Sequence, residues 1–290
     1  MPVPYSAEKD DLYYPAKHAV FFPNGRPRSD AALCVEMARL AYCRLDASFA
    51  FDQDRIRKVL GRILFTDCKF FETATAPDGG GSHALLAIDD DNKLAVLSFR
   101  GTDKDDPTDL GDDLNALPQP WPAGGKVHSG FAKAFQELWP GVEAALQQVK
   151  EYRLLFTGHS LGAAMATLAA TLREPQSLYT IGSPRVGDQA FADLLQGLDN
   201  HRYVDCCDLV TRVPPEVFGY AHIPGMIHYI NFNRNVQQLY PNDPFIESDR
   251  TQAEENYVKN YAWRVGDIAL RPLADHAPVN YVLPVTAATP

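Results

Sequence analysis

The chain has 290 residues, of which 46% are hydrophobic and 22% charged, and its formal net charge is −10. These proportions are typical of a globular protein that buries a sizeable core. The acidic balance argues against a nucleic-acid-binding protein and against electrostatic docking on anionic lipid, because both rely on basic patches. Neutral and interfacial substrates remain open.

The N-terminal residues 1–10 contain no basic segment followed by an apolar core, so they do not predict a signal peptide. No apolar run reaches the length of a membrane span. The cysteines are odd in number and lack a C-x-x-C pair, which predicts free thiols and neither a disulfide framework nor a zinc site. They are Cys34, Cys43, Cys68, Cys206 and Cys207. We therefore expect a cytoplasmic protein, with a secreted mature form as the alternative.

The first third of the chain predicts an arm and two helices. Residues 1–28 contain five prolines and predict an irregular N-terminal arm. Ser29 predicts the start of a helix over 31–45, whose apolar residues recur at helical spacing. A second helix is expected to begin at Asp52 or Asp54 and to end near 63.

Strands and helices alternate along the rest of the chain. A helix is expected over 130–150, with an interruption at Pro140, and residues 103–126, rich in Asp, Pro and Gly, predict a loop or short-helix excursion. Apolar runs predict strands at 84–88, 94–99, 153–157, 178–182, 202–206 and 226–232. This alternation predicts an α/β fold in which a mostly parallel sheet has helices on both faces. We expect a single domain over 1–290.

The pentapeptide Gly158-His159-Ser160-Leu161-Gly162 lies between an apolar strand-like run and an apolar helix-like run. A G-x-S-x-G sequence in that position predicts a nucleophile elbow, the tight turn that presents a serine hydroxyl at the top of a sheet. The serine of such a turn has a strained backbone, and glycines on either side let the strand and the helix approach closely. Ser160 is therefore the candidate nucleophile.

A serine nucleophile needs a base and an acid that orients the base. With a nucleophile elbow, the chain order is serine, then Asp or Glu, then His. Asp208 follows a predicted strand and precedes the loop that contains Pro214 and Pro215, at the sheet edge where catalytic groups gather. Asp205, within the strand, is the alternative.

Three histidines follow Asp208 in the chain. His228 lies in a predicted strand, where a packed imidazole is the simpler reading, and His222 could brace the proline-rich loop. His276 lies in a short polar loop before the last apolar stretch, which suits a base that reaches over the sheet edge. We therefore favour His276 as the base.

Acyl-transfer chemistry also needs donors for the oxyanion that forms on the attacked carbonyl. The backbone N–H of Leu161 is one donor by the geometry of an elbow. Thr102, at the end of the run Phe99-Arg100-Gly101-Thr102, is the candidate for the second, because it follows a strand and a glycine. No metal or cofactor is required.

Five short motifs follow one another along the chain and together resemble the motifs of a known family. They are Phe99-Arg100-Gly101-Thr102, Val127-His128-Ser129-Gly130-Phe131, the pentapeptide around Ser160, Gly182-Ser183-Pro184-Arg185-Val186-Gly187 and Asp208-Leu209-Val210. Together with Asp275-His276 and Tyr281 they make residues 84–281 resemble the class 3 (fungal-type) triacylglycerol lipases. The resemblance implies an α/β-hydrolase fold, a Ser160-Asp208-His276 triad, an oxyanion hole at Thr102 and Leu161, and a lid at 103–120.

The lid candidate departs from the pattern of that family. Asp103, Asp105 and Asp106 precede Asp109-Leu110-Gly111-Asp112-Asp113-Leu114, where lids often carry tryptophan and other apolar residues. So acidic a segment offers little apolar surface, which argues against strong activation at a lipid interface. Calcium binding by these residues is disfavoured because the spacing differs from an EF-hand loop.

The sequence thus predicts a serine hydrolase that cleaves carboxylic esters, as a lipase or carboxylesterase acting on an ester or lipid substrate with at most transient contact with a lipid interface. A phospholipase A1, a feruloyl-type esterase, a thioesterase or an acyltransferase could use the same triad. A catalytically inactive binding scaffold is the disfavoured alternative.

Overall fold

The computed structural model describes residues 3–17, 20–45, 48–73, 81–101 and 117–289. Its centre is an eight-stranded sheet with the order β1-β2-β3-β6-β7-β8-β9-β10. The strands are β1 (Asp67–Glu72), β2 (His83–Asp89), β3 (Leu94–Phe99), β6 (Arg153–His159), β7 (Ser177–Ile181), β8 (Asn200–Asp205), β9 (Ile227–Ile230) and β10 (Val236–Leu239). The strands from β3 to β9 pair in parallel, and the two edges of the sheet are antiparallel.

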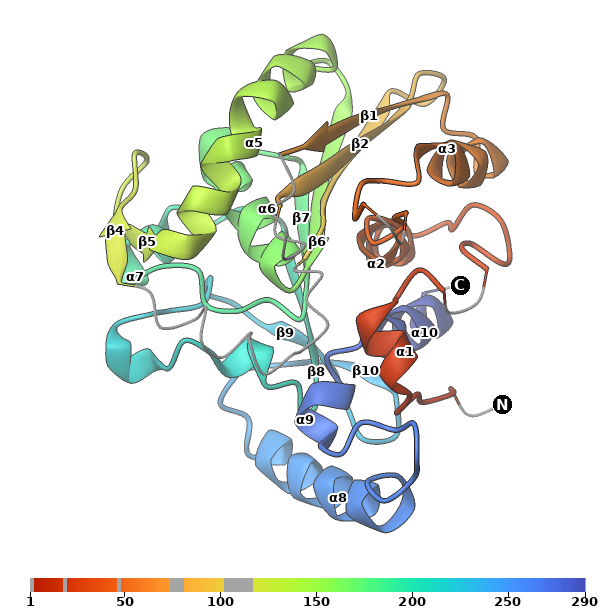
Figure 1. Ribbon diagram of the computed structural model, residues 1–290. Helices are drawn as coiled ribbons and strands as arrows, with labels where there is room; N and C mark the ends of the chain where they lie inside the picture. Colours follow the sequence, from red (N-terminus) through yellow and green to blue (C-terminus); the bar gives the residue numbers. More distant parts are fainter. Residues whose placement is uncertain (1–2, 18–19, 46–47, 74–80, 102–116, 290) are drawn as a thin grey trace.

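Helices pack on both faces of this sheet (Figure 1). Helices α2, α3 and α10 share one buried cluster with the sheet, and α5 and α6 share another on the opposite face. The longer helices are α2 (Asp30–Leu40), α3 (Gln53–Arg62), α5 (Ser129–Gln148), α6 (Leu161–Leu172), α8 (Pro244–Asn260) and α10 (Pro278–Ala288), and the shorter ones are α1 (Lys9–Tyr13), α7 (Gln189–Asp193), α9 (Arg271–Ala274), η1 (Val210–Arg212) and η2 (Glu216–Phe218). The predicted α/β class with a mostly parallel, two-sided sheet is confirmed.

The alternation of side chains explains why the central strands are apolar throughout. In β3, Leu94 and Val96 face the α2 side, whereas Ala95 and Leu97 face the α5 and α6 side. Every residue of this strand is buried. Because both faces of such a strand are buried, its sequence is a continuous apolar run. These runs predicted the central strands of the sheet.

The predicted helix starts agree with the structure. The Ser29 hydroxyl accepts a hydrogen bond from the Ala32 N–H at the start of α2, and the Asp52 carboxylate accepts one from the Arg55 N–H at the start of α3. Helix α2 ends at Leu40 and not at 45, because the chain turns there and the Cys43 carbonyl accepts a hydrogen bond from the Asp52 N–H.

The expected interruption at Pro140 does not occur, because α5 continues through it. Pro140 lies on the exposed side of the helix. The carbonyl that loses its intrahelical partner there belongs to Gln136, which is also exposed, so water can hydrogen-bond to it.

The elements that the sequence patterns missed include three at the edges of the fold. Strands β1 and β10 and helix α8 border the sheet, and α8 is polar on average. The N-terminal arm, expected to be irregular over 1–28, contains the short helix α1. Asn280 of α10 binds this arm through two hydrogen bonds: its side chain accepts one from the Ser6 N–H and donates one to the Ser6 carbonyl.

The predicted lid falls mostly on residues that the structure does not describe. Residues 103–116 of the lid candidate lie outside the described part of the chain, as does Thr102. The described end of the lid candidate forms β4 (Pro118–Pro120), which pairs with β5 (Lys126–His128) in a separate two-stranded sheet.

Candidate active site

Ser160 occupies the turn between β6 and α6 with φ 60° and ψ −128°. A positive φ is strained for a residue with a Cβ, so the surrounding structure must hold the serine in this conformation. Part of that support is a hydrogen bond of 3.0 Å from the Ser160 N–H to the Ile181 carbonyl of β7. The predicted elbow is therefore present, with the serine between a strand and a helix.

The two glycines of the pentapeptide are sterically required. A Cβ on Gly158 would lie 2.3 Å from the Gly162 carbonyl oxygen, and a Cβ on Gly162 would lie 2.2 Å from the Phe99 carbonyl oxygen. These separations are far shorter than any contact between non-bonded heavy atoms. The glycines thus let β6, α6 and the end of β3 converge at Ser160.

His276 and Asp208 form a hydrogen-bonded pair, although they are 68 residues apart. The His276 Nδ1 lies 2.9 Å from the Asp208 Oδ2, and both side chains are buried. The His276 Nε2 is also buried and has no hydrogen-bond partner among the described residues. The pair therefore leaves open the nitrogen that a general base would use.

Asp208 is held by neighbours on three sides. Its Oδ1 accepts a hydrogen bond from the Val210 N–H at 2.8 Å, and its Oδ2 accepts one from the Tyr281 hydroxyl as well as contacting His276. Gly182 makes room for this arrangement, because a Cβ there would lie 2.8 Å from the Asp208 Oδ2. The sequence identifies Tyr281 only as part of a motif, and its contact with Asp208 joins residues too far apart in the chain to predict.

His159 connects the elbow to the loop of the candidate base. Its Nε2 donates a hydrogen bond of 2.8 Å to the His276 carbonyl, and its Nδ1 lies 2.8 Å from the Tyr42 hydroxyl. Burial, followed by the nearby His276, lowers the pKa of His159 well below its usual value, so this imidazole is neutral. Because Ser160 is the next residue, the contact brings the serine turn and the His276 loop together.

The alternative acid and bases have other partners. The Asp205 carboxylate accepts two hydrogen bonds of 2.8 Å from Arg234, which makes it a buried ion pair. His228 stacks on Tyr203, and the His222 Nε2 donates to the Thr211 carbonyl. The geometry therefore favours Asp208 and His276, as the sequence did.

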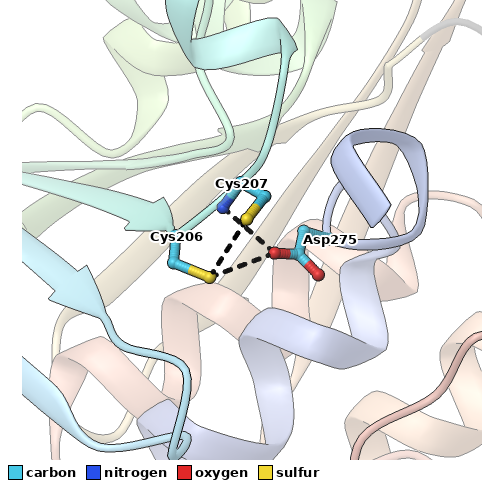
Figure 2. A group of neighbouring side chains, drawn as sticks. All are labelled: Cys206, Cys207 and Asp275. Atoms are coloured by element: carbon cyan, nitrogen blue, oxygen red, sulfur yellow. Dashed lines mark hydrogen bonds between the residues drawn. The ribbon is translucent and has the colours of Figure 1, made fainter. Parts of the chain in front are cut away.

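Cys206, Cys207 and Asp275 lie together (Figure 2). The Asp275 Oδ2 accepts hydrogen bonds from the Cys207 N–H at 3.0 Å and from the Arg271 guanidinium at 3.2 Å. Because Cys207 precedes Asp208 and Asp275 precedes His276, the contact ties the acid loop to the base loop.

The same three side chains have the spacing of metal ligands. The Arg271 guanidinium already neutralises the Asp275 carboxylate, however, and burial raises the pKa of the Cys206 thiol well above its usual value. A cation would have to displace an arginine and deprotonate a buried thiol. The arrangement fits a structural brace better than a metal site, and the five cysteines are free thiols, as predicted.

Of the two predicted oxyanion donors, one lies in the described part of the chain. Leu161 is the first residue of α6, where backbone N–H groups have no partner within the helix. Thr102 lies outside it, but the preceding turn is described. Gly101 fits closely there, since a Cβ on it would lie 2.1 Å from the Tyr42 hydroxyl oxygen.

The sheet order, the strand–serine–helix turn and the Asp208–His276 pair define an α/β-hydrolase fold with a candidate serine-nucleophile site. A family model described as lipase (class 3) matches residues 96–218. The structure resembles that of a fungal lipase in complex with an inhibitor, at 32% identity and a TM-score of 0.50, over 61% of this chain and 74% of the other. The chain belongs to the class 3 lipase family.

Other relatives agree with this assignment. A lipase from Rhizopus microsporus var. chinensis aligns with a TM-score of 0.57 at 29% identity, over 74% of this chain and 80% of the other. A secreted mono- and diacylglycerol lipase from Fusarium solani is 38% identical over 152 residues, which are 49% of this chain and 46% of that protein. The chain spans about half the length of the curated relatives it matches.

The described helices include none long and apolar enough to cross a membrane.

Proposed function

We propose that this protein hydrolyses carboxylic esters of the acylglycerol type, with Ser160 as nucleophile, His276 as base and Asp208 as the acid that orients it. The observation that carries the proposal is the strained serine turn beside a buried His–Asp pair whose outer nitrogen has no described partner. Family membership and the names of the lipase relatives support an ester as substrate.

In this mechanism His276 removes the Ser160 proton as the hydroxyl attacks the ester carbonyl. Asp208 stabilises the imidazolium that forms, and the N–H groups of Leu161 and Thr102 bind the oxyanion. The alcohol then leaves with the proton from His276. Water, activated by the same base, attacks the acyl-enzyme and releases the carboxylic acid.

Turnover of p-nitrophenyl butyrate by the wild type and by Ser160→Ala tests this proposal. We expect the variant to lose at least about 10⁴-fold in kcat, because the acyl-enzyme can no longer form. Ser129→Ala is a control, since Ser129 is the first residue of α5 and is neither a candidate triad residue nor an oxyanion donor. Comparable rates in Ser160→Ala and the wild type would refute the proposal.

The substrate is tested by a series of acylglycerols, each measured below and above its solubility limit. A rate increase at the emulsion threshold would identify a lipase, and saturation below it an esterase. We expect saturation below the threshold, because the lid candidate is rich in aspartate. Phospholipids, feruloyl esters and thioesters, and added alcohols as acceptors, distinguish the other activities that the same triad could support.

A further inference from the structure

A cavity of about 960 Å³ lies beside the loop that carries Asp208. None of the three candidate triad residues is among its described lining residues. One wall is the chain after Asp208, where the Thr211 hydroxyl donates a hydrogen bond to the Asp208 carbonyl. Another wall is β8, which contributes Arg202 and Val204.

The notable residue of this cavity is Arg202. Its side chain lines the cavity, yet the residue is only 5% exposed. In the described part of the chain its side chain has no hydrogen bond and no ion pair. Burial, with a further contribution from the nearby Arg185, lowers its pKa to about 10, and no carboxylate compensates. A guanidinium that is mostly covered by the protein, faces the cavity and has no protein partner can bind an anionic ligand from the cavity.

A second polar group at the same place also lacks a partner. Thr180 of β7 pairs in register with Arg202, and its buried Oγ1 has no hydrogen-bond partner among the described residues. Both residues line a small space that adjoins the larger cavity. A hydroxyl next to a guanidinium provides the donors that an oxyanion needs.

The charges around the cavity favour an anion. Four arginines line it, namely Arg185, Arg202, Arg212 and Arg250, in a chain whose net charge is −10. Arg185 is paired with the lining carboxylate of Glu216 at 2.7 Å, and the Glu216 side chain is largely exposed. Burial, followed by Arg202, lowers the pKa of His222 well below its usual value, so this imidazole adds no charge of its own.

The remaining walls indicate what the anion carries. They include an apolar stretch formed by Val204, Ile223, Ile227, Ile246, Pro215 and Pro224. The volume far exceeds that of an inorganic oxyanion. A ligand that satisfied Arg202 alone would leave this apolar surface in contact with water, whereas a hydrocarbon chain would cover it.

We propose that this cavity binds an amphiphilic oxyanion, with a carboxylate or phosphate headgroup on Arg202 and Thr180 and a hydrocarbon chain along the apolar wall. The site is separate from the serine site and does not depend on the proposed ester hydrolysis. A fatty acid and a phosphorylated lipid share this chemistry, and the two arms of the test distinguish them.

The test measures binding of octanoate and octyl phosphate to the full chain by isothermal titration calorimetry, with thermal unfolding in parallel. We expect at least one of the two to bind and to raise the Tm. 1-Octanol and acetate should bind at least about tenfold more weakly, because 1-octanol lacks the anionic headgroup and acetate lacks the hydrocarbon chain. Whichever of octanoate and octyl phosphate binds more tightly identifies the headgroup.

Arg202→Gln should weaken binding of that anion at least about tenfold, and Arg202→Lys less so, because lysine retains the charge without the planar fork. Arg28→Gln is the matched control, because it removes the same charge from an exposed position outside the cavity. Without ligand, Arg202→Gln should unfold at or above the wild-type Tm, since it removes an unpaired buried charge.

Three results would overturn the proposal. They are failure of the wild type to bind either anion, equal binding of 1-octanol and octanoate, and unchanged anion binding in Arg202→Gln. A lower Tm of the ligand-free Arg202→Gln, with no response of the wild type to anions, would show that Arg202 has a structural role only. None of these readouts requires turnover, so failure here and failure of the proposed ester hydrolysis are distinguishable.

Discussion

The candidate triad depends on residues that hold its members at fixed positions. Tyr281 donates a hydrogen bond to the Asp208 Oδ2, and its hydroxyl oxygen accepts one from the Asp205 N–H at 3.1 Å. Asp208 thus keeps one orientation toward His276. This is the kind of support that a base needs if its tautomer and direction are to remain fixed.

Replacing Tyr281 by Phe should therefore reduce kcat for p-nitrophenyl butyrate by about tenfold or more, because a hydrogen bond to a charged group contributes about 1.5–3 kcal/mol. KM should change little, since Tyr281 lies behind the acid and away from the nucleophile. Tyr240→Phe is the matched control, because Tyr240 is 63% exposed. An unchanged kcat in Tyr281→Phe would show that Asp208 does not need this hydroxyl.

The sequence could predict Ser160, Asp208 and His276 because each has a local signal. Ser160 has a pentapeptide, and the other two have loop positions in the required chain order. The contact of His159 with Tyr42 had no such signal, because it joins residues 117 positions apart. Arg202 was missed for a related reason, since an arginine in a strand gives no indication of whether a partner faces it.

Among the elements, the turn from β6 to α6 is tightly constrained. Gly158 and Gly162 face each other across it, and neither position has room for a Cβ. By contrast, Gly61 lies in α3 with nothing within 4 Å of the place where a Cβ would be. The same substitution at these positions should therefore have opposite effects.

Gly162→Ala should lower the Tm by several degrees and abolish esterase activity, because overpacking against the Phe99 carbonyl costs about 1–3 kcal/mol or more. Gly61→Ala should raise the Tm slightly, because alanine favours a helix by about 0.8–1.0 kcal/mol relative to glycine. Differential scanning calorimetry of both variants measures the contrast. Equal Tm values would contradict the close convergence of β3, β6 and α6.

The elements that sequence patterns predicted best are those covered on both faces. The central strands are continuous apolar runs, and α2 and α3 begin with capping side chains. Helix α8 was missed because its residues are polar on average and because one of its few buried residues is Asp249. The interruption predicted at Pro140 was wrong because the sequence does not show that Pro140 faces solvent, where α5 tolerates it.

Several histidines of the fold are buried or half-buried in the neutral form. Burial, followed by Arg100, lowers the pKa of His83 to about 3, and burial followed by His201 lowers that of His228 to about 4. The pKa values of His159 and His222 are lowered as well, chiefly by burial. In the unfolded chain these groups titrate near the usual value of about 6.5.

Folding stability should therefore fall as the pH drops below about 6.5. A folded-state pKa below the unfolded value means that protons bind the unfolded chain preferentially between the two values. Each histidine contributes a slope of at most about 1.4 kcal/mol per pH unit in that window, and its full contribution is present above pH 6.5. For His83 the window extends from about 6.5 to about 3.

Urea unfolding at pH values between 7.5 and 4.5 measures this dependence. The free energy of unfolding should be nearly constant above pH 7 and should decrease steadily below 6.5, with a shallower slope in His83→Gln. A free energy that stayed constant down to pH 4.5 would contradict the burial of these imidazoles in their neutral form.

In the proposed mechanism, His276 and Asp208 activate the Ser160 hydroxyl. The most direct measurement is covalent labelling by a fluorophosphonate, followed by intact mass and peptide mapping, in the wild type and in His276→Ala. We predict one label per wild-type chain, located on Ser160, and labelling of His276→Ala that is slower by at least about a thousandfold. An unlabelled wild type, a label on another residue, or equal labelling of the two proteins would show that this triad does not activate Ser160.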